Sequence, residues 1–164
     1  PRDETMFVLT ERSPHLPAHP GQIGLPAAMQ HPNEALELTA CREAEEEIGI
    51  VALALEFLGA LSPVFIPPSH IVLHPFIGHL PEAPIFTALP REVTRIFEIP
   101  LTALMDPANL QTESRQIQGQ ESMVPYFALA GEKIWGATAI VLAELRGLLG
   151  GKSAADQAAR KRAT

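Results

Sequence analysis

The chain has little of several residue types that mark other classes of protein. It holds one cysteine, one tryptophan and one tyrosine among 164 residues. A single cysteine, Cys41, cannot form an internal disulfide, which excludes a disulfide-stabilised scaffold, and we expect it to be a small core residue. Basic residues are also scarce, 12 against 19 acidic ones, for a net charge of −7. We therefore expect no nucleic-acid partner, because nonspecific binding of nucleic acid needs basic patches.

Long apolar runs are missing as well. No stretch is long enough to span a membrane as a helix, and no signal peptide is visible, so we predict a cytoplasmic protein with no membrane partner. Hydrophobic residues still make up 46% of the chain, which argues against disorder throughout. We expect one domain over residues 1–149, because this length suits a single core, and a flexible, basic tail over residues 150–164.

The residue pattern predicts alternating strands and helices. Apolar and β-branched runs indicate strands, and Asn33 is a suitable N-cap for the first long helix. The predicted strands cover residues 6–10, 53–61, 71–80, 92–99 and 126–129. The predicted helices cover 34–48 and a segment from Ile134 or Trp135 to Leu149, with a helical turn at Pro100-Leu101, a loop over 62–70 and a hairpin over 110–122. This mixture predicts the α/β (α+β) class.

The segment over residues 42–50 reads Arg-Glu-Ala-Glu-Glu-Glu-Ile-Gly-Ile. At about 100° per residue, Glu43, Glu46 and Glu47 fall on one stripe of a helix, and Gly49 suits a left-handed C-terminal cap. Such an acidic stripe is often only a solvated helix face. Three neighbouring carboxylates also repel each other unless a cation holds them, and Mg²⁺ or Mn²⁺ prefers oxygen ligands.

Glu34 lies eight residues before Arg42. The whole pattern resembles the Nudix box: Gly, five residues, Glu, seven residues, then Arg-Glu-U-x-Glu-Glu-x-Gly-U, in which U is apolar. Glu34 and residues 42–50 match it in register, while Ala28, preceded by Ala27, replaces the opening glycine. Alanine adopts a positive φ only at a cost. The two alanines therefore either distort the loop before the helix or are absorbed by it.

The flanking segments resemble one branch of that family, the coenzyme A diphosphatases. The lead-in and the later Glu-Val, Pro-Leu and Trp-Gly-x-Thr-Ala elements carry this resemblance. They lie at residues 9–13, 19–23, 91–93, 97–101 and 134–139.

The resemblance implies a Nudix-type α/β/α sandwich around a mixed sheet, with the usual N-terminal strand apparently absent from residues 1–149. It implies that Glu43, Glu46 and Glu47 hold Mg²⁺ or Mn²⁺. Arg42 is expected to orient a carboxylate through a forked ion pair. Glu34 is either part of this site or an ordinary helix-start carboxylate.

Two sources of the general base remain open. In the family it comes from the box, where Glu46 is a candidate, or from a later loop, where Glu92 is our candidate. Glu98 shares the predicted strand face of Glu92, but its context is structural. His70 and His74 make a poor zinc pair, because Pro75 and the apolar strand disfavour a helix there. Trp135 is expected to anchor the core rather than to line a substrate cleft.

The predicted function is a metal-dependent hydrolase that cleaves the diphosphate linkage of coenzyme A or a related nucleoside diphosphate derivative. The alternative is a catalytically weak or inactive Nudix-fold module that binds nucleotides. The predicted partners are this small-molecule substrate and a second copy of the chain in a homodimer.

Overall fold

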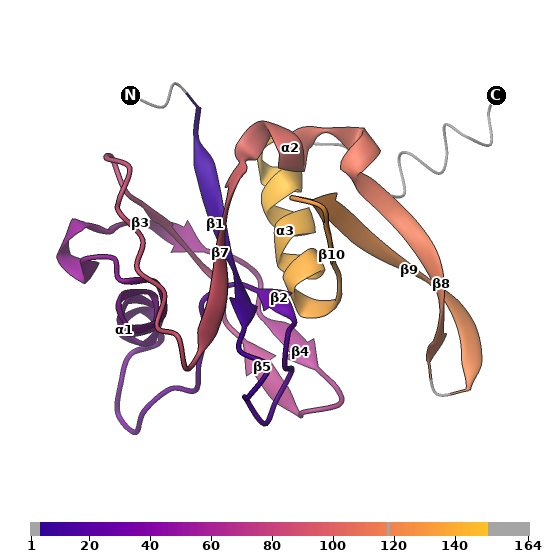
Figure 1. Ribbon diagram of the computed structural model, residues 1–164, viewed down its shortest axis with the longest axis horizontal. Coiled ribbons are helices and arrows are strands. Elements are labelled where there is room, and N and C mark those ends of the chain that lie inside the picture. Colours follow the sequence, from indigo (N-terminus) through magenta and orange to yellow (C-terminus); the bar gives the residue numbers. More distant parts are fainter. Residues whose placement is uncertain (1–3, 118, 151–164) are drawn as a thin grey trace.

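A computed structural model describes residues 4–117 and 119–150 and shows ten strands and three α-helices in this part of the chain (Figure 1). The strands are β1 (Met6–Arg12), β2 (Ile23–Gly24), β3 (Glu56–Ala60), β4 (Val64–Ile66), β5 (Ile71–Leu73), β6 (Phe76–His79), β7 (Val93–Pro100), β8 (Leu110–Ile117), β9 (Gln120–Leu129) and β10 (Glu132–Ile134). The helices are α1 (Leu36–Ile48), α2 (Leu101–Met105) and α3 (Gly136–Leu148), with 3₁₀ turns at Ala52–Ala54 and Pro107–Asn109.

The described strands form four groups, in which every pair is antiparallel. Two three-stranded sheets have the orders β2-β1-β7 and β10-β9-β8, and two hairpin-like pairs are β3-β6 and β4-β5. The predicted α+β class is therefore confirmed, but the predicted mixed sheet is wrong for the described strands, because all their pairs are antiparallel. The described strands do not join into one continuous hydrogen-bonded sheet.

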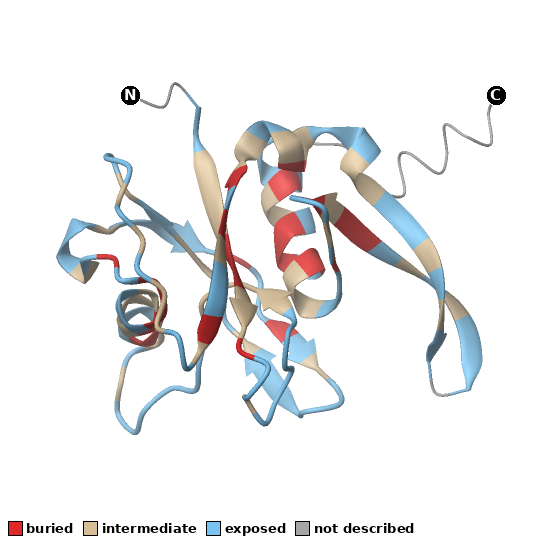
Figure 2. Ribbon diagram, in the orientation of Figure 1, coloured by how far each residue is buried: buried red, intermediate tan, exposed pale blue. Residues whose placement is uncertain are grey.

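The main core lies between the β1–β7 pair and the β9–β10 pair, with α2 and α3 packed against it. Figure 2 shows buried residues concentrated along β7, α3 and the end of β9. The buried core residues are Leu9, Phe97, Ile99, Leu104, Phe127, Leu129, Ile134, Ala139 and Leu142. Because α3 contributes Ala139 and Leu142 to this core, the helix fixes the two sheets relative to each other.

Several predicted boundaries are wrong for local reasons. Proline cannot continue a strand ladder, so Pro75 divides the predicted strand 71–80 into β5 and β6. The predicted loop 62–70 contains β4, and the predicted strand 53–61 begins with the 3₁₀ turn. The hairpin predicted over 110–122 is confirmed as β8 and β9, and β9 also includes the predicted strand 126–129.

The predicted cap of the first helix is also wrong. Helix α1 begins at Leu36 after an extended Ala35, and Asn33 adopts a left-handed conformation with φ 65°. The Glu34 carboxylate accepts a hydrogen bond from the His31 backbone N–H at 3.1 Å and so closes the turn before the helix. Asn33 therefore lies within a turn and not at the helix start.

Trp135 does not anchor the core, contrary to prediction. It is 41% exposed and occupies the N-cap position of α3, whose inward side is built from later residues such as Leu142. The Arg115 guanidinium carbon lies 4.1 Å from the centre of the indole ring. Cys41 is half-buried, so the expectation of a core cysteine holds only in part.

The single-domain boundary stays a prediction, and the predicted tail, apart from Gly150, lies outside the described residues. In the described part of the chain, no helix combines the length and the apolar character needed to cross a membrane.

Candidate active site

The end of α1 is held in place by residues 87–89, in the connection between β6 and β7. Gly49 caps the helix with φ 73°, a left-handed conformation that glycine adopts freely. The Thr87 N–H donates to the Ile48 carbonyl at 2.9 Å, and the Leu89 N–H donates to the Glu47 carbonyl at 3.1 Å. A Cβ at position 49 would lie 3.1 Å from Thr87. Glycine therefore allows this segment to close over the last turn of α1.

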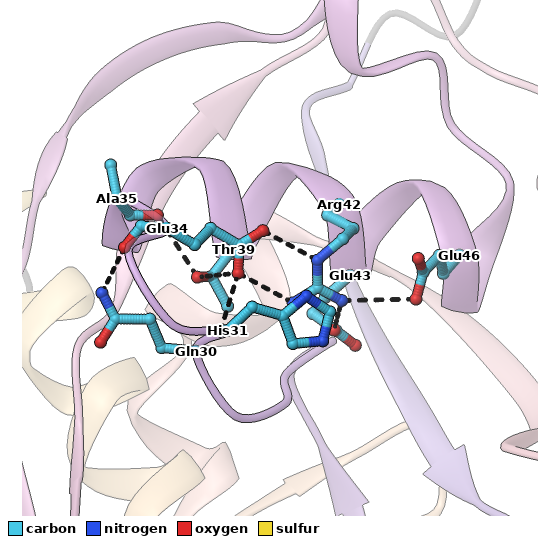
Figure 3. Close-up of polar contacts among 8 residues, drawn as sticks. All are labelled: Gln30, His31, Glu34, Ala35, Thr39, Arg42, Glu43 and Glu46. Atoms are coloured by element: carbon cyan, nitrogen blue, oxygen red, sulfur yellow. Dashed lines mark hydrogen bonds and ion pairs between the residues drawn. The ribbon is translucent and has the colours of Figure 1, made fainter.

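Arg42 is the centre of a charged network on α1 (Figure 3). Its Nε lies 2.9 Å from Glu34 Oε1 and its Nη2 lies 3.1 Å from Glu34 Oε2, which is a forked ion pair. Its Nη1 donates to Glu43 and lies 3.4 Å from Glu46 Oε2. The predicted role of Arg42 in orienting carboxylates therefore agrees with the geometry.

Glu34 is held in its charged form. Hydrogen bonds from the Arg42 side chain, the His31 backbone N–H and the Thr39 hydroxyl lower its pKa from 4.5 to about 2, although desolvation opposes this. The Thr39 Oγ1 donates to Glu34 Oε2 at 2.8 Å, and Thr39 itself is buried. Glu34 is therefore more than a helix-start carboxylate, because its side chain bonds both the His31 backbone in the loop before α1 and the Arg42 guanidinium.

Glu47 is buried, only 4% exposed, and its pKa is raised from 4.5 to about 7. Desolvation is the largest cause, and the negative charges of Glu43 and Glu92 raise the pKa further. The positive charge of Arg12 and a hydrogen bond from the Ala27 backbone lower it. The structure thus brings both Glu43 and Glu92 within electrostatic reach of Glu47.

The three predicted metal ligands are not equivalent. Glu43 and Glu47 are buried at 3% and 4% exposure, whereas the Glu46 side chain is 52% exposed and paired with Arg42. Within the described ranges, no three His, Cys, Asp or Glu side chains form a ready-made metal cage. Two mutually repelling carboxylates still fit Mg²⁺, which usually takes one or two carboxylates and completes its shell with water and substrate phosphate.

Backbone hydrogen bonds position Glu92 beside this site. The Glu92 N–H donates to the Leu89 carbonyl at 2.9 Å, and the Ser13 N–H donates to the Glu92 carbonyl at 2.8 Å. Its half-exposed side chain pairs with Arg91 at 3.2 Å and still acts on Glu47. Glu98 lies farther along β7, opposite Val8 of β1, and borders the cavity described below.

The two alanines that replace the expected glycines are accommodated without strain in φ. Neither Ala27 nor Ala28 has a positive φ, so neither needs the conformational freedom of glycine. Ala27 also supplies a backbone hydrogen bond to Glu47. The alternative in which this loop absorbs the substitutions is therefore the one that the structure favours.

A cavity of about 1340 Å³ lies beside the network. Its walls come from the inward side of α1, from β1, β5 and β6, and from α3, and they include Ala28 and His70. Glu43 borders it, whereas Glu46, Glu47 and Glu92 do not. The cavity and the acidic cluster therefore meet only at Glu43, and we place the candidate chemistry at the carboxylates.

The remaining predicted groups contribute less. His70 and His74 both border the cavity, but no metal cluster includes them in the part of the chain that the structure describes. Two residues were given no role from sequence and act here: Arg12, through its charge on Glu47, and Thr39, through Glu34. Arg12 lies in the lead-in segment that resembles the family, which is the signal that could have identified it.

The chain matches the NUDIX domain over residues 1–119. It belongs to the Nudix family. It is 32% identical over 140 residues to an uncharacterized Nudix hydrolase, NudL, of Photorhabdus laumondii, an alignment that covers 85% of this chain and 74% of that protein. It is 33% identical over 142 residues to Nudix hydrolase 15, mitochondrial, of Arabidopsis thaliana, covering 82% of this chain and 50% of that protein. The chain therefore spans half the length of the Arabidopsis relative.

The fold is likewise similar to a solved Nudix structure. A MutT/nudix family protein from Enterococcus faecalis superposes with a TM-score of 0.57 and 18% sequence identity, over 90% of this chain and 56% of that one. The predicted Nudix fold is thus confirmed, and the sequence matches confirm the family. The likeness to these relatives shows the family but not the coenzyme A diphosphatase branch, which stays a prediction.

Proposed function

We propose that the chain is a metal-dependent hydrolase that cleaves the diphosphate linkage of coenzyme A or a related nucleoside diphosphate derivative. The observation that carries the proposal is the buried pair Glu43 and Glu47, placed beside the Arg42–Glu34 ion pair and within electrostatic reach of Glu92. Burying two carboxylates side by side is costly unless a cation or a proton compensates them. A site for a divalent cation explains this arrangement.

In this proposal Glu43 and Glu47 hold Mg²⁺ or Mn²⁺, and Glu46 joins them by turning away from Arg42. A bound divalent cation would neutralise diphosphate charge, polarise the phosphorus and lower the pKa of the attacking water. Arg42 keeps Glu43 oriented, as second-layer partners of metal ligands generally do. Glu92 or Glu46 accepts the proton of the water.

The reaction balances without a further reactant. The water oxygen forms a bond to one phosphorus, and the bond from that phosphorus to the bridging oxygen breaks. One proton of the water passes to the carboxylate base, and the bridging oxygen leaves on the other phosphate. With coenzyme A, the products are adenosine 3′,5′-bisphosphate and 4′-phosphopantetheine.

The choice of coenzyme A as the substrate is the more specific part of the proposal. The flanking segments that resemble the diphosphatase branch support it, and one of them supplies Arg12 and another supplies Glu92 to the site. Membership of the Nudix family supports a small-molecule nucleotide derivative more generally. A homodimer and a cytoplasmic location stay predictions.

The test is product formation from coenzyme A and from a panel of nucleoside diphosphate derivatives, with Mg²⁺, with Mn²⁺ and with a chelator. Glu47→Gln should abolish metal-stimulated turnover. The matched control is Glu45→Gln, an exposed carboxylate on the same helix outside the network. Turnover of another derivative but not of coenzyme A would reject only the substrate. Nucleotide binding without turnover would favour the inactive module.

A further inference from the structure

Strand β8 forms the outer edge of the sheet β10-β9-β8, on a hairpin that extends away from the rest of the molecule (Figure 1). All eight of its residues pair with β9, from Leu110 opposite Phe127 to Ile117 opposite Gln120, with no shift in register. No other strand of the described chain pairs with its second edge. A free edge of this length presents backbone N–H and C=O groups to any strand that approaches it.

The sequence of β8 carries two charged residues, Glu113 and Arg115, but lacks the other features that usually protect an edge strand. Such strands are commonly shielded by proline, lysine or a bulge, and residues 110–117 contain neither proline nor lysine. The β1–β7 and β3–β6 ladders contain register shifts, but the β8–β9 ladder does not. The one proline of this hairpin, Pro125, lies on β9 and leaves the outer edge of β8 intact.

The charges of β8 are complementary to those of a second copy of the same strand. Glu113 and Arg115 flank Ser114 and lie on the same face of the strand, because side chains alternate. An antiparallel pairing centred on Ser114 places Glu113 opposite Arg115 of the second copy, twice. Shifting the centre by one residue places either two copies of Glu113 or two copies of Arg115 opposite each other. Opposite charges stabilise such a pair and like charges destabilise it.

Contacts within one copy fix where these two side chains lie. Glu113 pairs with Lys133 and with Arg115, whose Nε lies 2.5 Å from Glu113 Oε1, and the Arg115 guanidinium also stacks on Trp135. Strand β10 covers only residues 127–129 of β9, so the outer part of the hairpin is a two-stranded ribbon. An isolated two-stranded ribbon is marginally stable, and its tip exposes Ile117 and Met123.

We propose that β8 pairs with β8 of a second copy of this chain, antiparallel and centred on Ser114, to give a twofold symmetric dimer with a continuous sheet. Such a pairing is isologous, so it closes on itself and does not continue into a fibre. Ile117 of one copy then lies opposite Gln111 of the other. This proposal does not depend on the proposed hydrolase activity.

Disulfide cross-linking tests the register directly. In a Cys41→Ala background, Ser114→Cys should form an intermolecular disulfide under mild oxidation, because residues that face each other across antiparallel strands have Cα atoms roughly 4.5–5.5 Å apart. The matched control is Thr112→Cys, which lies opposite Gln116 of the second copy and should remain monomeric on a nonreducing gel. Equal cross-linking of both variants, or none of Ser114→Cys, would overturn the proposed register.

Sedimentation velocity of the unmodified chain over a range of concentrations tests the charges. The chain should dimerise, and Arg115→Glu should raise the dissociation constant roughly tenfold, since two like-charge pairs replace two ion pairs. The double variant Glu113→Arg with Arg115→Glu should restore most of the dimerisation, although it loses the Arg115–Trp135 contact and sets a second positive charge beside Lys133. A monomer at every concentration, or no recovery in the double variant, contradicts the proposal.

Discussion

Arg42 binds Glu34 through two nitrogens, with Nε 2.9 Å from Oε1 and Nη2 3.1 Å from Oε2. The same guanidinium uses Nη1 for Glu43 and Glu46. Arg42 thus connects the turn before α1 to two of the three predicted metal ligands. This relation explains why an arginine is suited to the position, because lysine offers one compact ammonium group and cannot fork.

Arg42→Lys should therefore lower both metal affinity and kcat by about 10–100-fold, the usual cost of losing a partner of a metal ligand. Titration with Mn²⁺ and steady-state kinetics with the preferred substrate measure the two effects. Arg95→Lys is the control, because the Arg95 side chain is 55% exposed and pairs with Glu11 and Glu132, which are not among the proposed site residues. Unchanged metal affinity in Arg42→Lys would show that the fork does not position Glu43.

The pKa of Glu47 predicts the pH dependence of the metal-free protein. A carboxyl whose pKa is raised from 4.5 to about 7 binds its proton more tightly in the folded chain than in the unfolded chain. Its contribution to stability is therefore present below pH 4.5 and decreases as the pH rises towards 7. Glu34 has a pKa of about 2, so its contribution is fully present throughout this window.

Urea unfolding at pH 5 and pH 8 with a chelator measures this effect. The unmodified protein should lose more stability between the two pH values than Glu47→Gln, in which the titrating group is gone. Every other ionisable group is present in both proteins, so its effect cancels in the comparison. Mn²⁺ should stabilise the unmodified protein at pH 8 much more than Glu47→Gln. Identical pH profiles for the two proteins would mean that Glu47 is not desolvated as described.

The Nudix box could be predicted from the sequence because each of its features depends on residues that are close together in the chain. Gly49 at the end of α1 follows from the preference of glycine for a left-handed cap, and the register from Glu34 to Arg42 is fixed by spacing along the chain. The different burial of Glu46 and Glu47 is not local. It depends on groups distant in sequence, because Arg12, the Ala27 backbone and Glu92 all act on the Glu47 carboxyl.

The difference between local features and contacts with distant segments also explains the incorrect predictions. A helix stripe places Glu43, Glu46 and Glu47 together, but it cannot show which of them other segments cover. Asn33 is a good cap by residue type, yet the hydrogen bond from His31 to Glu34 places it inside a turn.

Ala28→Gly should not increase the rate of the enzyme. Ala28 has no positive φ, so glycine relieves no strain there and adds conformational freedom to the unfolded chain. We expect a loss of roughly 0.5–1 kcal/mol in the free energy of unfolding and no gain in kcat. The matched control is Ala130→Gly, at φ 52°, where glycine should instead stabilise the chain. An increase in kcat for Ala28→Gly would indicate a strained loop.

The last prediction concerns Trp135, which lies at the surface and not in the core. Because its side chain is 41% exposed, Trp135→Ala should cost about 1–2 kcal/mol, less than the roughly 3–5 kcal/mol typical of a buried tryptophan. About 0.5–1 kcal/mol of this should be the contact with Arg115, whose guanidinium carbon lies 4.1 Å from the ring centre.

Denaturant unfolding of Trp135→Ala, Arg115→Gln and the double variant measures the cost and separates the contact from general packing. The two changes should be less than additive by the energy of the contact, and the Michaelis constant should not change, because Trp135 does not border the cavity. Additive losses would exclude the cation–π contact. If Trp135→Ala alone lowered the free energy of unfolding by more than about 3 kcal/mol, this would indicate that Trp135 is a buried core residue.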